Sequence, residues 1–458
     1  MKFRTLVYES SCEWETLINY IGENTLLDPI LYISTSRCAD IHVHTWDQPS
    51  YRKSSFTGIS RQVYDQVIPR MYQFIDMYCR NLSPVLQSSY RNWTIHKYVN
   101  IFNILLEEIT HLLVKNRVEV ILLARIPHLG SDFLLAIIGE ALGLKVIILQ
   151  QFDICDNRFF IYAGTKELGL FKNAPIIYDT KETLELTLGF EHNWPYMTDI
   201  KCFKSRLATS RLRFAFTFFY DVKNAFKRRT SNSVFYDFCH KYILHKQEQR
   251  YLKHIIICST TDPQLESRFI YFPLHLQPEM TTSMLGGDFA DQALAIERLS
   301  ERLPAGWNIF VKENPRQSAF MRDDGFFARL QNIDAVTLVS PDVPSHILME
   351  KSALVATISG TAGWEAISGG KPVLVFGEPW YREYPGVISY RDDIDLMEIS
   401  RLKPEPSHVQ VTMTQMLSKM GRGRVYGHIE HLELMRSEKN SREVADSLQR
   451  YLIASLNT

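Results

Sequence analysis

The sequence predicts an α/β protein made of two Rossmann-like domains that face each other across a cleft. Three observations support this fold class. The chain has 458 residues, which is more than one ordinary hydrophobic core holds. Short apolar runs alternate with longer helical patterns in both halves. A glycine-rich turn stands between two apolar runs late in the second half, as expected where a strand leads into a helix of a parallel sheet.

The first half of the chain shows the pattern of a β-α-β protein. Strands are expected at 3–8, 30–33, 118–123 and 145–150, and helices at 62–79, 101–114 and 133–142. This order predicts a parallel sheet with functional loops at its carboxyl edge. We assign residues 1–245 to this first domain.

The second half repeats the pattern over residues 246–430. Strands are expected at 254–258, 307–312, 336–339, 353–358 and 372–376, and helices at 289–303, 347–352 and about 364–368. The remaining residues, 431–458, contain an amphipathic helical pattern with Val444, Leu448 and Leu452 on one face. We expect this last helix to pack back on the first domain and to brace the two domains.

The turn Ser359-Gly360-Thr361-Ala362-Gly363 is the most informative motif of the chain. It joins an apolar run to a short helical segment, so it places backbone N–H groups of a helix N-terminus beside the edge of a parallel sheet. Such an end attracts phosphate, and the hydroxyls of Ser359 and Thr361 can add hydrogen bonds. Glu365, in the first turn of the helix, can reach a ribose hydroxyl. The alternative is an ordinary crossover whose glycines serve only packing.

A loop rich in polar side chains and prolines spans 271–279. Prolines stiffen a loop, so His275, Gln277 and Glu279 are expected to hold fixed positions. His275 is a candidate general acid or phosphate ligand, and Glu279 is a candidate base or ribose ligand. The alternative is a proline-rich connection between domains that binds nothing.

Lys312 and Arg316 flank a short turn directly after the strand predicted at 307–312. Two cations at the carboxyl end of a strand suit a phosphate leaving group. Asn314, in the same turn, can donate a hydrogen bond to a phosphate oxygen but cannot transfer a proton. We expect this turn and the glycine-rich turn to face the same edge of one sheet.

His128 and Asp132 lie in the loop after the strand predicted at 118–123. One of them can serve as base for an acceptor hydroxyl, or Asp132 can cap the helix that begins near Phe133. His42 and His44 have strand spacing, so both rings would point the same way, but the pair alone does not make a metal site. We expect no metal and no tightly bound cofactor.

The segment 201–250 combines many basic residues with interleaved aromatic residues. It predicts either a helix on an anionic membrane surface, or a helix whose aromatic side chains pack on the first domain while its basic side chains form a solvated face or line a nucleotide cleft. The formal net charge of the chain is zero, which gives no case for nucleic-acid binding.

Other features of the sequence predict a cytoplasmic protein. The seven cysteines are scattered and form no CxxC pair, which favours reduced thiols. The first residues lack the apolar core of a signal peptide, and the apolar runs are too short to span a bilayer. Residues 201–250 are the segment expected to touch the inner face of a membrane.

The region from 271 to 387 contains three motifs, FPLHLQPEMTT, LPAGWNIFVKENPRQ and TISGTAGWEAISGGKPVLVFGEPWYREYPGV, and a helical segment with Asp291 and Gln292. In them the chain resembles the bacterial capsule polysaccharide biosynthesis proteins, which are GT-B-type glycosyltransferases that include Kdo-transferring capsule enzymes. The resemblance implies a GT-B fold with an N-terminal acceptor domain and a C-terminal nucleotide-sugar domain. Relatives usually carry histidine where this chain has Asn314.

The resemblance also implies roles for individual residues. Residues 359–361 would hold the donor phosphates, and Glu365 would hold the ribose. His275, Gln277 and Lys312 would approach the phosphates or the donor sugar. The expected function is transfer of a sugar, such as a CMP-activated acidic sugar, from a nucleotide-activated donor to a growing surface polysaccharide or lipid-linked glycan.

Two alternative functions stay open. A CDP-alditol phosphotransferase of the teichoic acid type uses a similar Ser-Gly and Glu arrangement late in the chain. A non-catalytic glycan- or nucleotide-binding subunit of a polysaccharide assembly complex is the other alternative, and Asn314 in place of histidine favours it.

Overall fold

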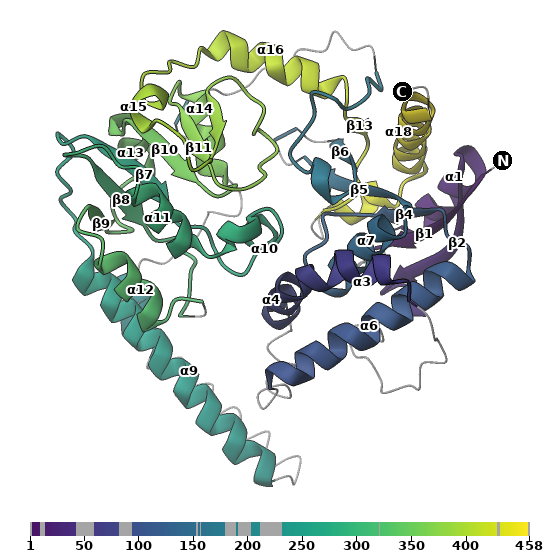
Figure 1. Cartoon of the computed structure of the whole chain (residues 1–458), viewed down its shortest axis with the longest axis horizontal. Coiled ribbons are helices and arrows are strands. Elements are labelled where there is room, and N and C mark those ends of the chain that lie inside the picture. Colours follow the sequence, from purple (N-terminus) through teal and green to yellow (C-terminus); the bar gives the residue numbers. More distant parts are fainter. Residues whose placement is uncertain are drawn as a thin grey trace. The chain divides into compact units, whose positions relative to one another are not determined.

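The computed structural model describes two compact units (Figure 1). Unit 1 combines Met1–Leu184 with Gln410–Thr458, and unit 2 contains Glu185–Val409. The described residues are 2–9, 14–42, 59–81, 94–152, 154–155, 157–178, 189–190, 203–210, 231–319, 321–427 and 431–456, without the side chains of 79–81 and 231–241. The predicted class, an α/β protein with two parallel-sheet domains, is confirmed.

Unit 1 is built on a seven-stranded sheet with the order β13-β6-β5-β4-β1-β2-β3. Its strands are β1 (Phe3–Tyr8), β2 (Leu27–Ser34), β3 (Ile41–His42), β4 (Val120–Leu123), β5 (Lys145–Gln151), β6 (Arg158–Ala163) and β13 (Gly421–Arg422). The strands from β3 to β5 pair in parallel, whereas β6 is antiparallel to both β5 and β13. The β-α-β pattern of the sequence predicts the parallel strands β1, β2, β4 and β5, but not β3, β6 or β13.

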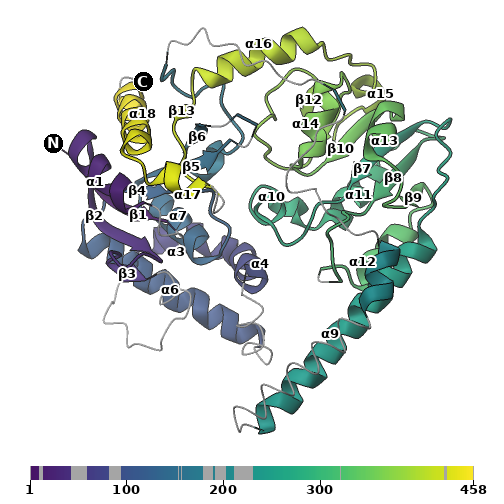
Figure 2. The ribbon, with the colours of Figure 1, turned by 180° about the vertical axis from the view of Figure 1, so that it is seen from behind.

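Helices cover both faces of this sheet (Figures 1 and 2). They are α1 (Glu15–Asn24), α3 (Arg61–Val67), η1 (Ile68–Arg70), α4 (Met71–Asn81), α6 (Ile95–Lys115), α7 (Ser131–Ala141), η2 (Thr165–Glu167), α17 (Leu432–Met435) and α18 (Glu438–Leu456). Val120 and Leu122 of β4 belong to the core under α1 and α18, which pack against each other. Ile121 faces the opposite way, because its side chain lies against Gly139 of α7. Successive side chains of β4 therefore pack against helices on opposite faces of the sheet.

Unit 2 contains a six-stranded sheet with the order β12-β11-β10-β7-β8-β9, in which every pair of neighbours is parallel. Its strands are β7 (Phe269–Pro273), β8 (Asn308–Lys312), β9 (Val336–Val339), β10 (Leu354–Thr357), β11 (Val373–Val375) and β12 (Val387–Ser389). We number the strands 1 to 6 along the chain, from β7 to β12. Read across the sheet from β9, their order is then 3-2-1-4-5-6. This is the order of Rossmann domains, which bind ligands where the order reverses. Here that switch point lies between β7 and β10.

The helices of unit 2 surround a core of large apolar side chains. They are α9 (Ser231–Cys258), α10 (Met280–Ser283), η4 (Gly287–Ala290), α11 (Gln292–Ser300), α12 (Asp324–Gln331), α13 (Ser345–Lys351), α14 (Thr361–Ser368) and α15 (Leu396–Ile399), and α16 (Pro406–Leu417) runs across the division between the units. Alternate residues of two neighbouring strands, Ile270 and Phe272 of β7 and Ile309 and Val311 of β8, join one core cluster with Ile296 of α11. This packing fixes which side of each strand faces the helices.

The strand predicted at 254–258 is wrong, because these residues form the last turns of α9. Tyr251, Leu252 and Ile255 are buried in the core of unit 2, whereas Ile257 is 78% exposed. Burial at spacings of one and four positions is helical. A short apolar run does not by itself distinguish a strand from part of a helix. The first strand of unit 2 is β7, so residues 271–273, which were expected to begin a loop, are the end of a strand.

The chain passes from unit 1 to unit 2 after residue 184 and returns to unit 1 after residue 409. The domain boundaries expected from the sequence lie after residues 245 and 430. The last turns of α9 pack into the core of unit 2, so the residues just before 246 go with that unit. Within the segment 201–250, residues 211–230 lie outside the described residues, as does His44 of the histidine pair. Across the described ranges, no helix combines the length and the apolar character needed to cross a membrane.

Candidate functional site

The edge of the sheet at the switch point of unit 2 gathers residues from three of the predicted motifs. His275 lies in the loop after β7, and Ser359, Gly360 and Thr361 follow β10 and lead into α14. Lys312 ends β8, the strand that pairs with β7. In open parallel sheets the loops at the carboxyl ends of such strands form the ligand crevice. The structure therefore brings these five residues to one edge of one sheet.

His275 is held by hydrogen bonds at its backbone and its ring. Its backbone N–H donates to Oε1 of Gln292 over 2.7 Å, and its carbonyl accepts from Nε2 of Gln292 over 3.2 Å. Its ring Nε2 lies 2.8 Å from Oγ1 of Thr357, the last residue of β10. Burial, supported by the positive charge of Arg322, lowers the pKa of His275 to about 3. The ring is therefore neutral at physiological pH.

Gly360 has no room for a side chain, because the ring of His275 lies against it. A Cβ at this position would stand 2.8 Å from Cε1 and 2.9 Å from Nε2 of that ring. The φ angle of Gly360, −79°, is ordinary, so space and not backbone conformation requires glycine. Oγ of Ser359 donates to the carbonyl of Thr281 over 2.5 Å, and the carbonyl of Gly360 accepts from the hydroxyl of Tyr381. Partners on both sides thus fix the turn.

Glu365 lies one turn into α14, close to two buried tyrosines. Burial and then the charge of Glu365 raise the pKa of Tyr381 well above its usual value. Burial also raises the pKa of Tyr271, with a smaller contribution from the same carboxylate. Because these tyrosines stay protonated, they add no negative charge near Glu365.

Lys312 is a buried cation at the end of β8. Its Nζ donates to the carbonyl of Val343 over 2.5 Å and to Oγ of Ser345 over 2.9 Å. The hydroxyl of Tyr271 donates to the same Oγ over 3.2 Å. Burial lowers the pKa of Lys312 to about 8, and the charge of Asp342 opposes this effect. Lys312 is therefore mostly charged at neutral pH, but close to the pH at which it loses its proton.

A buried ion pair behind this edge is absent from the sequence predictions. Arg322 contacts Glu313 over 2.9 Å, and it also donates to the carbonyl of His275 over 3.0 Å and to Oε1 of Gln277 over 2.5 Å. Nε2 of Gln277 donates to the carbonyl of Ala290 over 2.6 Å. Both ends of the Gln277 amide thus have protein partners, so this side chain holds the loop after β7 in place.

Asn314 and Glu279 lie near the same edge with different surroundings. Oδ1 of Asn314 accepts from the backbone N–H of Arg316 over 2.9 Å, a contact by which asparagine commonly stabilises a turn. Glu279 is exposed and directly precedes α10, but its side chain makes no capping hydrogen bond. The protein atoms around its carboxyl raise the pKa of Glu279, and Arg316 opposes this effect.

In unit 1, Asp132 stabilises the loop between β4 and α7. The side chain is 1% exposed, and its carboxylate accepts from the backbone N–H groups of His128 over 3.0 Å, of Leu129 over 2.7 Å and of Phe133 over 2.7 Å. Asp132 is not the N-cap, because α7 begins at Ser131 after Gly130, which makes no side-chain cap hydrogen bond; the carboxylate instead holds the loop just before the helix. Nδ1 of His128 lies 2.8 Å from the carbonyl of Ile126, and burial lowers the pKa of His128.

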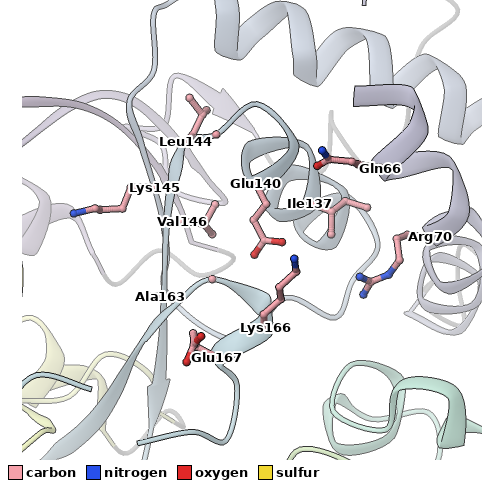
Figure 3. A pocket seen from close by; sticks show the side chains of 12 residues that line it. Gln66, Arg70, Ile137, Glu140, Leu144, Lys145, Val146, Ala163, Lys166 and Glu167 are labelled. Carbon is pink, nitrogen blue, oxygen red and sulfur yellow. The ribbon is translucent and has the colours of Figure 1, made fainter. Parts of the chain in front are cut away.

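A hollow of about 800 Å³ lies elsewhere in unit 1 (Figure 3). Its lining residues come from α3, η1, α7, β5, β6, η2 and the turn before β5: Gln66, Arg70, Ile137, Glu140, Gly143, Leu144, Lys145, Val146, Ala163, Gly164, Lys166 and Glu167. It opens at the amino end of β5, whereas His128 follows the carboxyl end of the parallel strand β4. Glu140 points into it but accepts from the N–H and the hydroxyl of Thr165, over 2.6 and 2.9 Å. No predicted site residue lines this hollow.

No group of three or more His, Cys, Asp or Glu side chains could hold a metal ion, as far as the described ranges extend. Residues 214–421 match the model of a protein family described as capsule polysaccharide biosynthesis protein. This match confirms the resemblance found in the sequence, and it extends that resemblance on both sides of residues 271–387. A comparison with curated protein sequences finds no match.

The chain is also similar to solved structures, all at low identity. The KpsC β-Kdo 2,7 transferase of Thermosulfurimonas dismutans is 13% identical, with 77% of this chain and 89% of that chain covered and a TM-score of 0.31. The β-Kdo 2,4 transferase of the same KpsC is 12% identical, with coverages of 70% and 88% and a TM-score of 0.29. The UDP-GlcNAc 2-epimerase of Neisseria meningitidis, bound to UDP-GlcNAc, is 16% identical, with complete coverage of both chains and a TM-score of 0.23.

Proposed function

We propose that this protein is a glycosyltransferase that moves a sugar from a nucleotide-activated donor to a growing surface or capsular polysaccharide. One observation carries the proposal. The part of the chain that matches the capsule polysaccharide family contains the whole parallel sheet of unit 2, and His275, Gly360 and Lys312 lie together at the carboxyl edge of that sheet. This edge is where parallel α/β sheets bind nucleotides.

In this proposal the donor phosphates bind at the turn 359–361 and the N-terminus of α14. A helix N-terminus favours negative charge, because its first N–H groups lack partners within the helix and the helix dipole is positive there. Lys312 adds a positive charge at the neighbouring strand end, and with a pKa of about 8 it keeps its proton at neutral pH. Glu365, in the same helix, would accept hydrogen bonds from the ribose hydroxyls.

The chemistry requires the bond between the anomeric carbon and the donor phosphate to break while an acceptor hydroxyl attacks. Negative charge grows on the departing nucleotide, so fixed donors at the turn and at Lys312 stabilise the transition state more than the ground state. Glu279, with its raised pKa and open carboxyl, is the candidate base in unit 2. His128 is the candidate base in unit 1, where Asp132 fixes its loop. Holding the acceptor in line supplies the remaining rate enhancement.

The donor that we favour is a CMP-activated acidic sugar, and the acceptor a glycan or lipid-linked glycan. We place the reaction in the cytoplasm, with residues 201–250 as the contact to the inner face of the membrane. The protein needs no metal in this scheme, because Lys312 and the helix N-terminus supply the positive charge.

Asn314 favours a second candidate function, a non-catalytic glycan- or nucleotide-binding subunit of a polysaccharide assembly complex. Its amide oxygen accepts a hydrogen bond from the backbone N–H of Arg316 within the same turn. An amide also cannot transfer a proton to a leaving phosphate. Asn314→His separates the two candidates. Turnover that rises with a nucleotide sugar supports the enzyme, whereas partner binding without turnover of any donor supports the subunit. A phosphodiester in the product would instead identify a CDP-alditol phosphotransferase.

The first experiment is a calorimetric titration with CMP, CDP, UDP, GDP and the matching nucleotide sugars. We expect one nucleotide to bind saturably, and Thr361→Ala and Glu365→Ala to weaken it by about tenfold or more. Glu301→Ala is the matched control, since Glu301 is exposed and follows α11, away from the carboxyl edge. A chain that binds none of these nucleotides would contradict the proposal.

A further inference from the structure

Thr357 and His275 form a buried hydrogen-bonded pair, and only one direction of this hydrogen bond leaves both side chains satisfied. Oγ1 of Thr357 is completely buried and lies 2.8 Å from Nε2 of His275. Counting every described residue, this contact is the one hydrogen bond of the Thr357 side chain. A neutral imidazole has one N–H and one acceptor nitrogen, so geometry alone allows the bond to run either way.

The direction of the hydrogen bond follows from the requirement that each buried donor has an acceptor. If Nε2 carried the proton and donated to Thr357, the hydroxyl proton of Thr357 would be buried without an acceptor, which carries the full desolvation penalty. If the hydroxyl donates to Nε2, both buried groups are satisfied and the ring proton is on Nδ1. We propose that Thr357 fixes His275 as the neutral Nδ1–H tautomer, and that this N–H donates a hydrogen bond to the leaving phosphate of the nucleotide sugar.

Nδ1 is available to a ligand at this edge. It makes no hydrogen bond within the described part of the chain, and it is not among the fully enclosed polar atoms that lack partners. Gln292 holds the backbone of His275 at both its N–H and its carbonyl, and Thr357 holds the ring at Nε2. Gly360 lies directly against the ring. The free nitrogen is therefore held beside the turn 359–361, where the proposed function places the donor phosphate.

His275 then acts as a hydrogen-bond donor and not as a general acid. Burial and the charge of Arg322, the ionised group that acts on this ring, keep the imidazolium form unpopulated at neutral pH. The bond between sugar and phosphate breaks with its electron pair going to the phosphate oxygen, and no proton leaves His275. A neutral N–H aimed at that oxygen stabilises the growing charge. The phosphate contact rests on the proposed function, whereas the tautomer does not.

Nitrogen NMR tests the tautomer directly. Long-range 1H–15N correlation spectra of the whole chain, labelled at histidine nitrogen, separate the Nδ1–H, Nε2–H and imidazolium states, and His275→Gln assigns the signal by its loss. We expect the Nδ1–H pattern for His275, unchanged between about pH 5 and pH 8. A pattern of Nε2–H, or an imidazolium at pH 7, would overturn the inference.

Two variants test the part played by Thr357. Thr357→Val removes the hydroxyl at nearly constant shape, and Thr357→Ser retains it. We expect Thr357→Val to give a signal for the Nε2–H tautomer and to weaken CMP or CDP binding about threefold to tenfold, whereas Thr357→Ser keeps the wild-type tautomer and affinity. A Thr357→Val variant that keeps a pure Nδ1–H pattern would show that another group sets the tautomer.

The NMR measurement of the tautomer and the measurement of nucleotide binding test separate parts of the inference. If His275 shows the Nδ1–H pattern but none of CMP, CDP, UDP, GDP and the matching nucleotide sugars binds, the proposed function and the phosphate contact fail while the tautomer assignment stands. If a nucleotide binds and the Nδ1–H resonance of His275 does not shift, the phosphate contact is overturned while the nucleotide site stands. A shift on binding that Thr357→Ser preserves and Thr357→Val loses supports every part of the inference.

Discussion

Arg322 and Glu313 form an ion pair inside unit 2, with Nε and Oε2 2.9 Å apart and side chains that are 0% and 2% exposed. The same guanidinium donates to the carbonyl of His275 and to the side chain of Gln277. One buried cation therefore joins the loop after β8 to the loop after β7. This connection lies behind the candidate site and determines how firmly the site is held.

Breaking this pair is expected to be costly. Arg322→Met leaves the Glu313 carboxylate buried without its cation, and we expect the free energy of unfolding to fall by about 3–5 kcal/mol in urea denaturation. Arg298→Met is the matched control, because Arg298 and Glu301 form an ion pair with both side chains about half exposed, and its loss should cost less than about 1 kcal/mol. Equal losses in the two variants would contradict this view of the buried pair.

Lys312 should make stability depend on pH. Its pKa falls from 10.5 to about 8 on burial, so below about pH 8 it is charged in both the folded and the unfolded chain and the folded state carries the whole desolvation cost. Between these values the unfolded chain binds the proton and the folded chain does not, so stability rises with pH. Above about pH 10.5 both states are neutral and the effect is complete.

Lys312→Met removes this titration. We expect the variant to exceed the wild type in free energy of unfolding by about 1–3 kcal/mol at pH 7, after allowance for two lost hydrogen bonds, with the advantage vanishing as the pH approaches about 10.5. Lys351→Met, at an exposed position of α13, should show no such pH-dependent difference. A wild type as stable as Lys312→Met at pH 7, with an unchanged difference at high pH, would argue against the buried charge.

Gly363 should tolerate no side chain, because the ring of Tyr381 lies against it inside α14. A Cβ there would stand 2.8 Å from Cζ of Tyr381. We expect Gly363→Ala to lower the free energy of unfolding by about 1–3 kcal/mol and to weaken nucleotide binding, since the same tyrosine holds the carbonyl of Gly360. In α12 the nearest atom to a Cβ at Gly325 is 3.4 Å away, so Gly325→Ala should stabilise by about 0.5–1 kcal/mol. Equal effects of the two alanines on unfolding in urea would contradict the close approach.

The last helix should contribute strongly to unit 1. Leu448 of α18 is completely buried in the same core as Leu17 of α1, so we expect Leu448→Ala to cost about 2–5 kcal/mol in urea denaturation. Ile453, on the same helix, is 48% exposed, and Ile453→Ala should cost less than about 1 kcal/mol. A small loss from Leu448→Ala would mean that α18 is dispensable for the core.

Local patterns in the sequence predict the parallel sheet of unit 2 well. Apolar runs bounded by turns mark β8, β9, β10 and β11, and the strand, glycine turn and helix around Gly360 appear as expected. Since parallel strands send their carboxyl ends to one edge, the sequence also brings Lys312 and the glycine turn together, whereas His275 joins them through β7, a strand that the sequence patterns do not predict. The run 254–258 misleads because its helical register becomes evident only with Tyr251 and Leu252.

The parts that the sequence does not reveal depend on contacts between distant segments. Nothing in the turn around Asn314 indicates that Glu313 is buried against Arg322, and nothing in the loop 271–279 indicates that the amide of Gln277 is used by that guanidinium. Thr357 reads as an ordinary strand residue until its hydroxyl is found against His275. Likewise β13 pairs with β6 from across some 260 positions of the chain, as Gly421 is the partner of Phe159.

Unit 2 is one continuous stretch, whereas unit 1 is assembled from both ends of the described chain. Nε1 of Trp14 donates to the carbonyl of Val425 over 3.0 Å, across 411 positions. During synthesis, all strands of the unit 2 sheet are therefore made before β13 and α18, the last elements of unit 1. Until α18 is made, the side of α1 that packs against α18 lacks this partner, so part of the apolar surface of unit 1 stays exposed after the sheet of unit 2 is complete.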